Sequence, residues 1–336
     1  MPTSGPDVET EYASVFQVTS TREEIVLFFG DRQPMGKDPE QVTARLKERI
    51  ILGPFIANLG TGITGEKGSL VLRLVENLGI KFGVEQSFKI FKNTLLANRF
   101  LLGFKKERIK QEPHERILDI CRRMDMPENL LRAYQGSLPG SNYLHFGFEE
   151  NEGSCLYKAY LEFYDRVEET MKTQPRKFDS FLMHLGFKWD ALDNSRQALT
   201  RYTWHPFLPV EVMLGRLSNI LDPHKLGTLF EIAKGIVAIA SRIVPPYDIL
   251  YMEVDEENNP RRSFDINMYR AKLPLSELQP WMSRMCDHYD ILPEAFHALY
   301  DGVKTRTFGH IAGGIDREGR DFLTIYYGVE YRSPNS

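Results

Sequence analysis

The chain has 336 residues, which is enough for two average domains or for one large barrel with an appendage. Its 42 lysines and arginines nearly balance 46 aspartates and glutamates, and the formal net charge of -4 excludes an overall basic field of the kind that binds nucleic acid or anionic membranes. The chain also lacks an apolar run of about 18 residues that could span a membrane, so we predict a cytoplasmic protein without nucleic-acid or membrane partners.

The first 67 residues are predicted to be a polar tail followed by a small module. Residues 1–11 are rich in Pro, Gly, Ser and acids, which is typical of a disordered tail. Residues 12–29 read as two strands around a polar turn, and Asp38 and Pro39 suit the N-cap and first position of a helix. We therefore predict a β-hairpin and helix module over residues 12–67.

Three short motifs of this module carry a resemblance. Tyr12-Ala13, Phe29-Gly30 and Arg49-Ile50-Ile51-Leu52 resemble the hallmarks of a family of small uncharacterised bacterial domains. The resemblance covers residues 12–60 and implies a bacterial protein, but that family supplies no activity.

Residues 68–135 are predicted to form a helical segment. Apolar residues recur at three- and four-residue spacing up to Phe104, and the spacing resumes after Pro113. The pattern indicates two or three amphipathic helices.

The remaining part, residues 136–336, repeats one pattern. Strand-like pairs separated by short turns occupy residues 143–163, 181–204, 248–272 and 308–330, with helix-like sequence between them. We predict an α+β fold of repeated helix–hairpin–helix units that form an antiparallel β-barrel surrounded by helices. Residues 12–29 are either a fifth hairpin of that barrel or part of a separate domain.

The strands alternate an apolar set of side chains with a polar and aromatic set, and the two sets must face opposite sides of the sheet. The polar set either faces water on an open sheet or lines the lumen of a closed barrel whose apolar set packs on helices. We expect the closed barrel. The polar side chains predicted to face its lumen include His145, Glu149, Lys158, Tyr160, Glu162, His184, Lys188, Tyr251, Glu253, Asp255, Asp265, Asn267, Tyr269, Thr324 and Tyr326.

Two motifs of the barrel carry a second resemblance. The Lys158-x-Tyr160 pair on a second strand, and a last hairpin of the form Gly314-Ile315-Asp316-x-x-Gly319 followed by Tyr326-Tyr327, resemble the aromatic prenyltransferases of the antiparallel α-β-β-α barrel type. The resemblance implies transfer of an allylic group from a diphosphate to an aromatic acceptor in a bacterial biosynthetic pathway.

The resemblance also implies roles for single residues. Lys158 and Tyr160 would contact the diphosphate, and Tyr269 and Tyr326 would shield the carbocation. Beyond the resemblance, their expected place in the lumen suggests that Glu253 or Glu162 takes a proton from the acceptor as the catalytic base. His184, Lys188 and Asn267 complete the predicted substrate-binding set.

The predicted lumen leaves a second function open. Lys158, Lys188 and Arg201 are few cations for a diphosphate beside the carboxylates expected there. A non-catalytic partner in a biosynthetic complex could instead bind a peptide along an exposed strand at residues 12–16. The identity of the small-molecule or peptide substrate and the oligomeric state are not indicated by the sequence.

No cofactor or metal is predicted. The eight histidines lack HxH and HxxxH spacing, and Cys121, Cys155 and Cys286 lack CxxC spacing, so neither a zinc site nor a disulfide framework is indicated. A glycine motif at Gly60, Gly62 and Gly65 matches a dinucleotide fingerprint in spacing only, because no uninterrupted strand precedes it.

Overall fold

The computed structural model describes residues 63–151, 154–173 and 180–333. All of them belong to the second of the two units into which the chain divides, Gly62–Ser336. The predicted tail, the hairpin at residues 12–29 and the resemblance to small bacterial domains lie outside the described residues and stay predictions.

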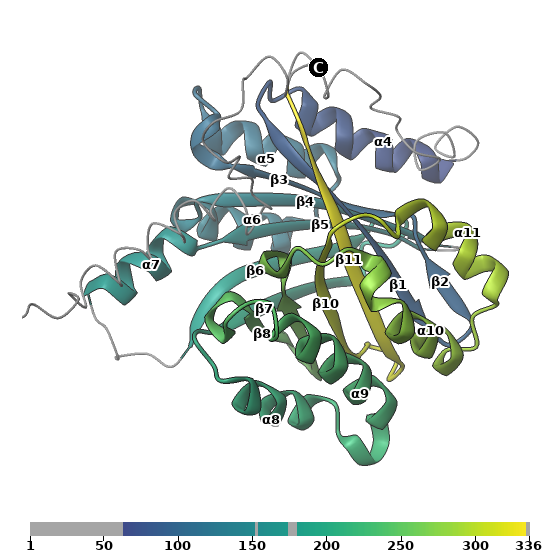
Figure 1. The fold of residues 1–336 in the computed structure, drawn as a ribbon. Coiled ribbons are helices and arrows are strands. Elements are labelled where there is room, and N and C mark those ends of the chain that lie inside the picture. The colour runs from purple at the N-terminus through teal and green to yellow at the C-terminus, as the bar shows by residue number, and fades with distance from the viewer. Residues whose placement is uncertain (1–62, 152–153, 174–179, 334–336) are drawn as a thin grey trace, which may run out of the picture. The chain divides into compact units, whose positions relative to one another are not determined.

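The strands follow one another along the chain with helical segments between them (Figure 1). The strands are β1 (Phe82–Phe91), β2 (Thr94–Leu96), β3 (Arg99–Lys105), β4 (Tyr143–Asn151), β5 (Ser154–Glu162), β6 (Phe181–Asp190), β7 (Gln197–His205), β8 (Leu250–Glu256), β9 (Asn259–Asn267), β10 (Phe308–Ile315) and β11 (Asp321–Arg332). The α-helices are α4 (Ile63–Glu76), α5 (Pro113–Arg123), α6 (Glu128–Ser137), α7 (Tyr164–Thr173), α8 (Val210–Ile220), α9 (Pro223–Ala240), α10 (Gln279–His288) and α11 (Pro293–Val303). Short 3₁₀ turns include η5 (Tyr269–Ala271) and η6 (Leu275–Leu278).

The sheet closes into a barrel. Its eleven strands are hydrogen-bonded in the order β11-β10-β9-β8-β7-β6-β5-β4-β3-β1-β2, and β11 also pairs antiparallel with β1. That last pairing closes ten strands into an antiparallel barrel and leaves β2 attached to β1 at its edge. Figure 1 shows β11 crossing directly beside β1 although the two strands come from opposite ends of the described chain. The predicted α+β fold with a closed antiparallel barrel is confirmed.

The prediction of helix throughout residues 68–135 is wrong from Phe82 to Lys105, where the chain forms β1, β2 and β3. In β1 the buried apolar residues Phe88 and Ile90 alternate with the polar residues Ser87 and Lys89. The segment shows this two-residue period as well as the helical spacing. Pairing with β11, which is distant in sequence, makes it a strand. The described barrel therefore closes without residues 12–29.

The outer face of the barrel is apolar and packs on helices. Phe264 and Ile266 of β9 are fully buried in one cluster with Ile232 and Ile236 of α9 and with Met282 of α10. Burying each such side chain contributes about 1.5–3 kcal/mol relative to leaving it in water. The alternate side chains of the same strands are thereby turned into the barrel. Within the described residues, every helix is too short or too polar to cross a lipid bilayer.

Close packing of α9 on α10 depends on a residue without a side chain. A Cβ atom at Gly235 would lie 2.0 Å from Cζ2 of Trp281. We expect Gly235→Ala to destabilise the fold by about 1–3 kcal/mol in urea unfolding, because the helices must separate to admit the methyl group. Gly215→Ala is the matched control, since no atom lies within 4 Å of the added Cβ in α8, and alanine there should be neutral or stabilising by up to about 1 kcal/mol. Equal stabilities of the two variants would contradict this account.

Candidate functional site

The barrel encloses a cavity of about 490 Å³. This volume lies in the range of about 300–1,000 Å³ that small-molecule sites occupy. Its lining residues come from all eleven strands and from turns between them. Besides three arginines of the turns, they include four cations and three tyrosines of the strands, which are Lys89, Arg99, Lys158, Lys188, Tyr160, Tyr202 and Tyr326.

The cations gather around one buried carboxylate. Arg99 Nε lies 3.1 Å from Glu149 Oε2, and Lys158 forms an ion pair with the same oxygen. Burial opposes ionisation of Glu149, but Arg99 and Lys158 outweigh it and hold the pKa of this carboxyl well below its usual range. Burial, with the neighbouring cations Arg99 and Lys89, lowers the pKa of Lys158 to about 8. This wall of the cavity therefore gathers several cations close to one carboxylate.

Strand register explains why these residues meet. Arg99 of β3 pairs with Glu149 of β4, and Lys158 of β5 pairs with Lys188 of β6. Residues directly opposite in adjacent strands point to the same face of the sheet. Gly147 pairs with Lys158, and a Cβ atom there would lie 2.9 Å from Leu101 Cδ1, so glycine leaves the room that the neighbouring side chains fill.

Tyrosine rings border the cationic wall. The rings of Tyr160 and Tyr202 meet edge to face with centroids 5.9 Å apart. Lys188 Nζ lies 5.9 Å from the ring centre of Tyr202, and the guanidinium carbon of Arg99 lies 5.9 Å from that of Tyr326. Their π faces offer the electron density that a cation attracts.

A second charged group lies next to Tyr326. The imidazole of His310 stacks on the Tyr326 ring at 3.9 Å between centroids. His310 Nδ1 lies 2.8 Å from Asp265 Oδ1, and His310 Nε2 lies 3.2 Å from Glu85 Oε1. Tyr269 Oη also donates to Glu85, at 2.6 Å. Burial opposes the charge of His310, but Asp265 and Glu85 outweigh it and raise the pKa to about 10. His310 is therefore an imidazolium at neutral pH.

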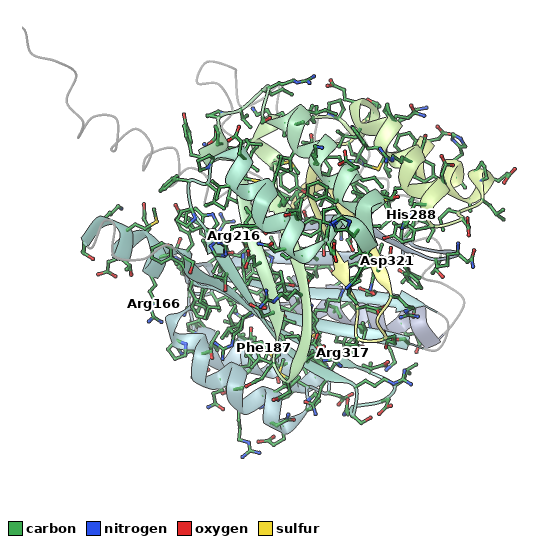
Figure 2. The ribbon with its side chains drawn as sticks, turned by 90° about the horizontal axis from the view of Figure 1, so that it is seen from below. Arg166, Phe187, Arg216, His288, Arg317 and Asp321 are labelled. Carbon is green, nitrogen blue, oxygen red and sulfur yellow. The ribbon has the colours of Figure 1, made fainter. Side chains whose placement is uncertain are left out.

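The mouth of the cavity carries arginines that are paired with acids. Arg317 binds Glu256, and Arg320 Nη2 lies 2.8 Å from Asp316 Oδ2. Figure 2 shows Arg317 at the turn between β10 and β11. Each of these two arginines is thus paired with an acid of the turn or of a neighbouring strand.

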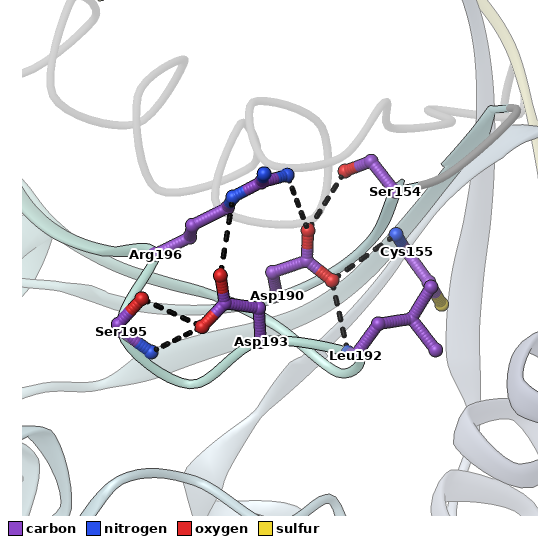
Figure 3. Close-up of polar contacts among 7 residues, drawn as sticks. All are labelled: Ser154, Cys155, Asp190, Leu192, Asp193, Ser195 and Arg196. Carbon is purple, nitrogen blue, oxygen red and sulfur yellow. Dashed lines mark hydrogen bonds and ion pairs between the residues drawn. The ribbon is translucent and has the colours of Figure 1, made fainter.

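The turn between β6 and β7 builds another part of this mouth (Figure 3). Asp190 Oδ1 accepts hydrogen bonds from the backbone N–H groups of Leu192 at 2.9 Å and Cys155 at 3.3 Å. Its Oδ2 accepts from Ser154 Oγ at 3.0 Å and lies 3.8 Å from Arg196 Nη1. One carboxylate thus ties the turn to the neighbouring strand β5 and fixes the rim.

The predicted site residues fall into three groups. Lys158, Tyr160, Lys188 and Tyr326 line the cavity. Glu162, His184, Asn267 and Tyr269 belong to the inward-facing set but do not line it. Tyr269 follows β9 in the turn η5.

The third group is the single residue Glu253 of β8. It was predicted to face the lumen, but it lies on the outer face. Val254 pairs with Ser263 and lines the cavity, so Glu253, one residue before it, points outward. Glu253 Oε1 accepts a 2.8 Å hydrogen bond from Arg216 Nε on α8 (Figure 2). Hydrogen bonding to His205 and Arg216 lowers the pKa of Glu253 to about 2, which suits an ion pair and not a base. The prediction for β8 was wrong because both faces of this strand carry apolar side chains. Val254 lies on the inner face, and Tyr251 lies on the outer face, where it packs in the helix-covered core.

Arg201 and Asp255 were also expected in the lumen, and they too lie on the outer face. They pair with each other across β7 and β8 and are exposed, so neither contributes to the lumen. The lumen cations that the sequence interpretation missed are Lys89 and Arg99, together with the carboxylate Glu85. All three lie in the segment that was predicted to be helical. The alternation of side chains within β1 is the signal that could have identified Glu85 and Lys89.

Comparisons with known proteins bear on the fold. No protein-family model and no curated protein matches the sequence. Among solved structures, 5-dimethylallyltryptophan synthase from Streptomyces coelicolor matches with a TM-score of 0.57 and 13% identity over 82% of this chain and 94% of that one. PriB in a binary complex with product diphosphate matches with a TM-score of 0.55 and 13% identity over 82% and 93%. The barrel is similar in fold to these prenyltransferases, as the sequence motifs implied.

The charge of His310 makes stability depend on pH. Its pKa rises from 6.5 to about 10 on folding, so its contribution is complete below about pH 6.5 and is lost as pH rises toward 10. We expect the difference in unfolding free energy between the wild type and His310→Gln to shrink between pH 6.5 and 10. Imidazole NMR signals of the wild type should show His310 protonated at pH 8. A neutral His310 at pH 7 would contradict the assignment.

Proposed function

We propose that this chain transfers an allylic group from a diphosphate to an aromatic acceptor inside its barrel. The observation that carries the proposal is the inner wall of the cavity, where Arg99 and Lys158 bind Glu149 and where Lys89 and Lys188 also line the cavity beside the three tyrosines. A diphosphate is a multiply charged anion, and a group of Lys and Arg side chains can bind it through charge-assisted hydrogen bonds. The structures of similar fold support the same chemistry, since PriB is described with product diphosphate and with L-tryptophan and dimethylallyl thiolodiphosphate.

The arrangement suggests a division of labour during transfer. The bond between the allylic carbon and the diphosphate oxygen breaks, and its electron pair leaves with the diphosphate. Lys158, Lys188 and Arg99 would stabilise the charge that develops on that oxygen. The faces of Tyr160, Tyr202 and Tyr326 would stabilise the allylic cation until an aromatic carbon of the acceptor attacks it.

The acceptor must then lose a proton to a carboxylate. Glu162 is the predicted base, but its side chain is fully buried and does not line the cavity. Asp265 does line the cavity, beside Tyr326, and His310 links it to Glu85. We therefore propose that Asp265 orients the acceptor and receives the proton, while Glu85 holds His310 in place beside it.

The other predictions about function keep their status. A role as a peptide-binding partner rests on residues 12–16, which lie outside the described part of the chain, and no contact in the described part favours it. We retain as proposals the repeat of helix, hairpin and helix along the barrel, the bacterial source and the cytoplasmic location.

Substitution of the inner cations tests the donor site. We expect Lys158→Ala and Lys188→Gln each to weaken binding of dimethylallyl diphosphate by roughly 10- to 100-fold, since a hydrogen bond to a charged group contributes about 1.5–3 kcal/mol. Isothermal titration calorimetry measures the change. Arg201→Gln is the matched control, because Arg201 is exposed on the outer face. If all three variants bind like the wild type, the proposed donor site is wrong.

The charge state of Lys158 predicts how binding depends on pH. The unliganded side chain has a pKa of about 8, so it loses its charge as pH rises through that value. We expect the affinity for dimethylallyl diphosphate to fall between pH 7 and 9, and to fall less in Lys158→Ala. Identical pH profiles for both proteins would show that Lys158 does not bind the diphosphate.

A further inference from the structure

Three potential metal ligands meet inside the barrel at a place that the cavity does not reach. His145 of β4, Glu162 of β5 and His184 of β6 each offer one ligand atom, and these atoms all lie within 4.8 Å of one another. Glu162 Oε2 lies 3.7 Å from His145 Nε2 and 3.4 Å from His184 Nδ1. None of the three lines the cavity, so the cluster is distinct from the proposed donor and acceptor sites.

The barrel holds these side chains together through register. Glu162 pairs directly with His184, and it pairs with Tyr143 on the other side, two residues before His145. The glutamate on the middle strand therefore lies between the two imidazoles. Side-chain exposure is 8% for His145, 0% for Glu162 and 14% for His184, so the group is screened from bulk water.

Packing around the cluster orients His145. Gly103 of β3 pairs with His145, and a Cβ atom at Gly103 would lie 3.1 Å from His145 Nδ1. The Nδ1 edge of the ring is thus packed against the glycine backbone, and the opposite nitrogen, Nε2, is the one directed at Glu162. A side chain at residue 103 would displace the ring from this position.

We propose that His145, Glu162 and His184 bind one divalent transition-metal cation, with Zn²⁺ as the best fit. Two imidazole nitrogens and one carboxylate oxygen are a donor set that suits Zn²⁺ and related borderline cations, whereas Mg²⁺ and Ca²⁺ prefer oxygen ligands. Metal–ligand bonds of about 2.0–2.1 Å in a tetrahedron place ligand atoms roughly 3.3 Å apart. The observed 3.4 and 3.7 Å separations need only small side-chain rotations to reach that geometry.

The charge of Glu162 also favours such an ion, because a neighbouring positive charge stabilises a buried carboxylate. A divalent cation would balance Glu162 and join β4, β5 and β6 below the rings of Tyr160 and Tyr202, which lie 6.2 Å from His145 and 5.7 Å from His184 between centroids. The sequence showed no metal motif because the ligands come from three separate strands.

The test uses the whole chain after treatment with a chelator. Titration with Zn²⁺ followed by calorimetry should show one ion bound per chain. Co²⁺ in place of Zn²⁺ should give the visible d–d absorption of a site with nitrogen ligands. Glu162→Gln and His184→Ala should each weaken Zn²⁺ binding by at least about 10- to 100-fold, the loss that removal of a mere supporting partner causes.

A surface pair provides the matched control. His288 Nε2 lies 3.0 Å from Asp321 Oδ2 on the outside of the barrel (Figure 2), and His288→Ala should leave Zn²⁺ affinity unchanged. The Co²⁺ spectrum of the wild type needs no variant, so it decides the matter even if a substitution prevents folding. Absence of stoichiometric binding in the wild type, or Zn²⁺ binding that His184→Ala and Glu162→Gln leave intact, would overturn the metal site. Neither result would affect binding of dimethylallyl diphosphate, which tests the donor site separately.

Discussion

The hydrogen bonding of β11 to β1 is the constraint on which the rest of the structure depends. It joins strands from the two ends of the described chain and turns a long antiparallel sheet into a closed barrel. Closure leaves no sheet edge in the ring of ten strands and divides the side chains into an outer and an inner set. The helices can cover only the outer set, so every charged side chain of the inner set must be balanced by another inner residue or by a bound ligand.

The inner charges are arranged in two groups. Arg99 and Lys158 bind Glu149 on a wall that Lys89 and Lys188 also line, whereas Asp265 and Glu85 bind the imidazolium of His310. Tyr326 contacts both groups, through Arg99 and through its stacking on His310. In the proposed function, the first group would bind the anionic donor and the second would serve the acceptor that loses a proton.

The local sequence predicted the strands and their inward residues where one face was clearly polar. The alternation of Lys158, Tyr160 and Glu162 with apolar residues in β5 indicated which side chains face the lumen, and the structure places them there. The same reasoning failed for β8, since both of its faces carry large apolar residues and Glu253 pairs with Arg216 on a helix that is distant in sequence. It also failed for β1, whose pattern fits a helix as well as a strand.

Local sequence thus specifies the period of the pattern: antiparallel hairpins with one apolar and one polar face, separated by amphipathic helices. Which residues become neighbours depends on how distant segments pair and pack. Arg99 meets Glu149, and His145, Glu162 and His184 converge, because strand register brings together positions that no local spacing relates. The physical reason is that side-chain alternation is set within a strand by its backbone geometry, whereas closure and register are set by pairing and packing between segments far apart in the chain.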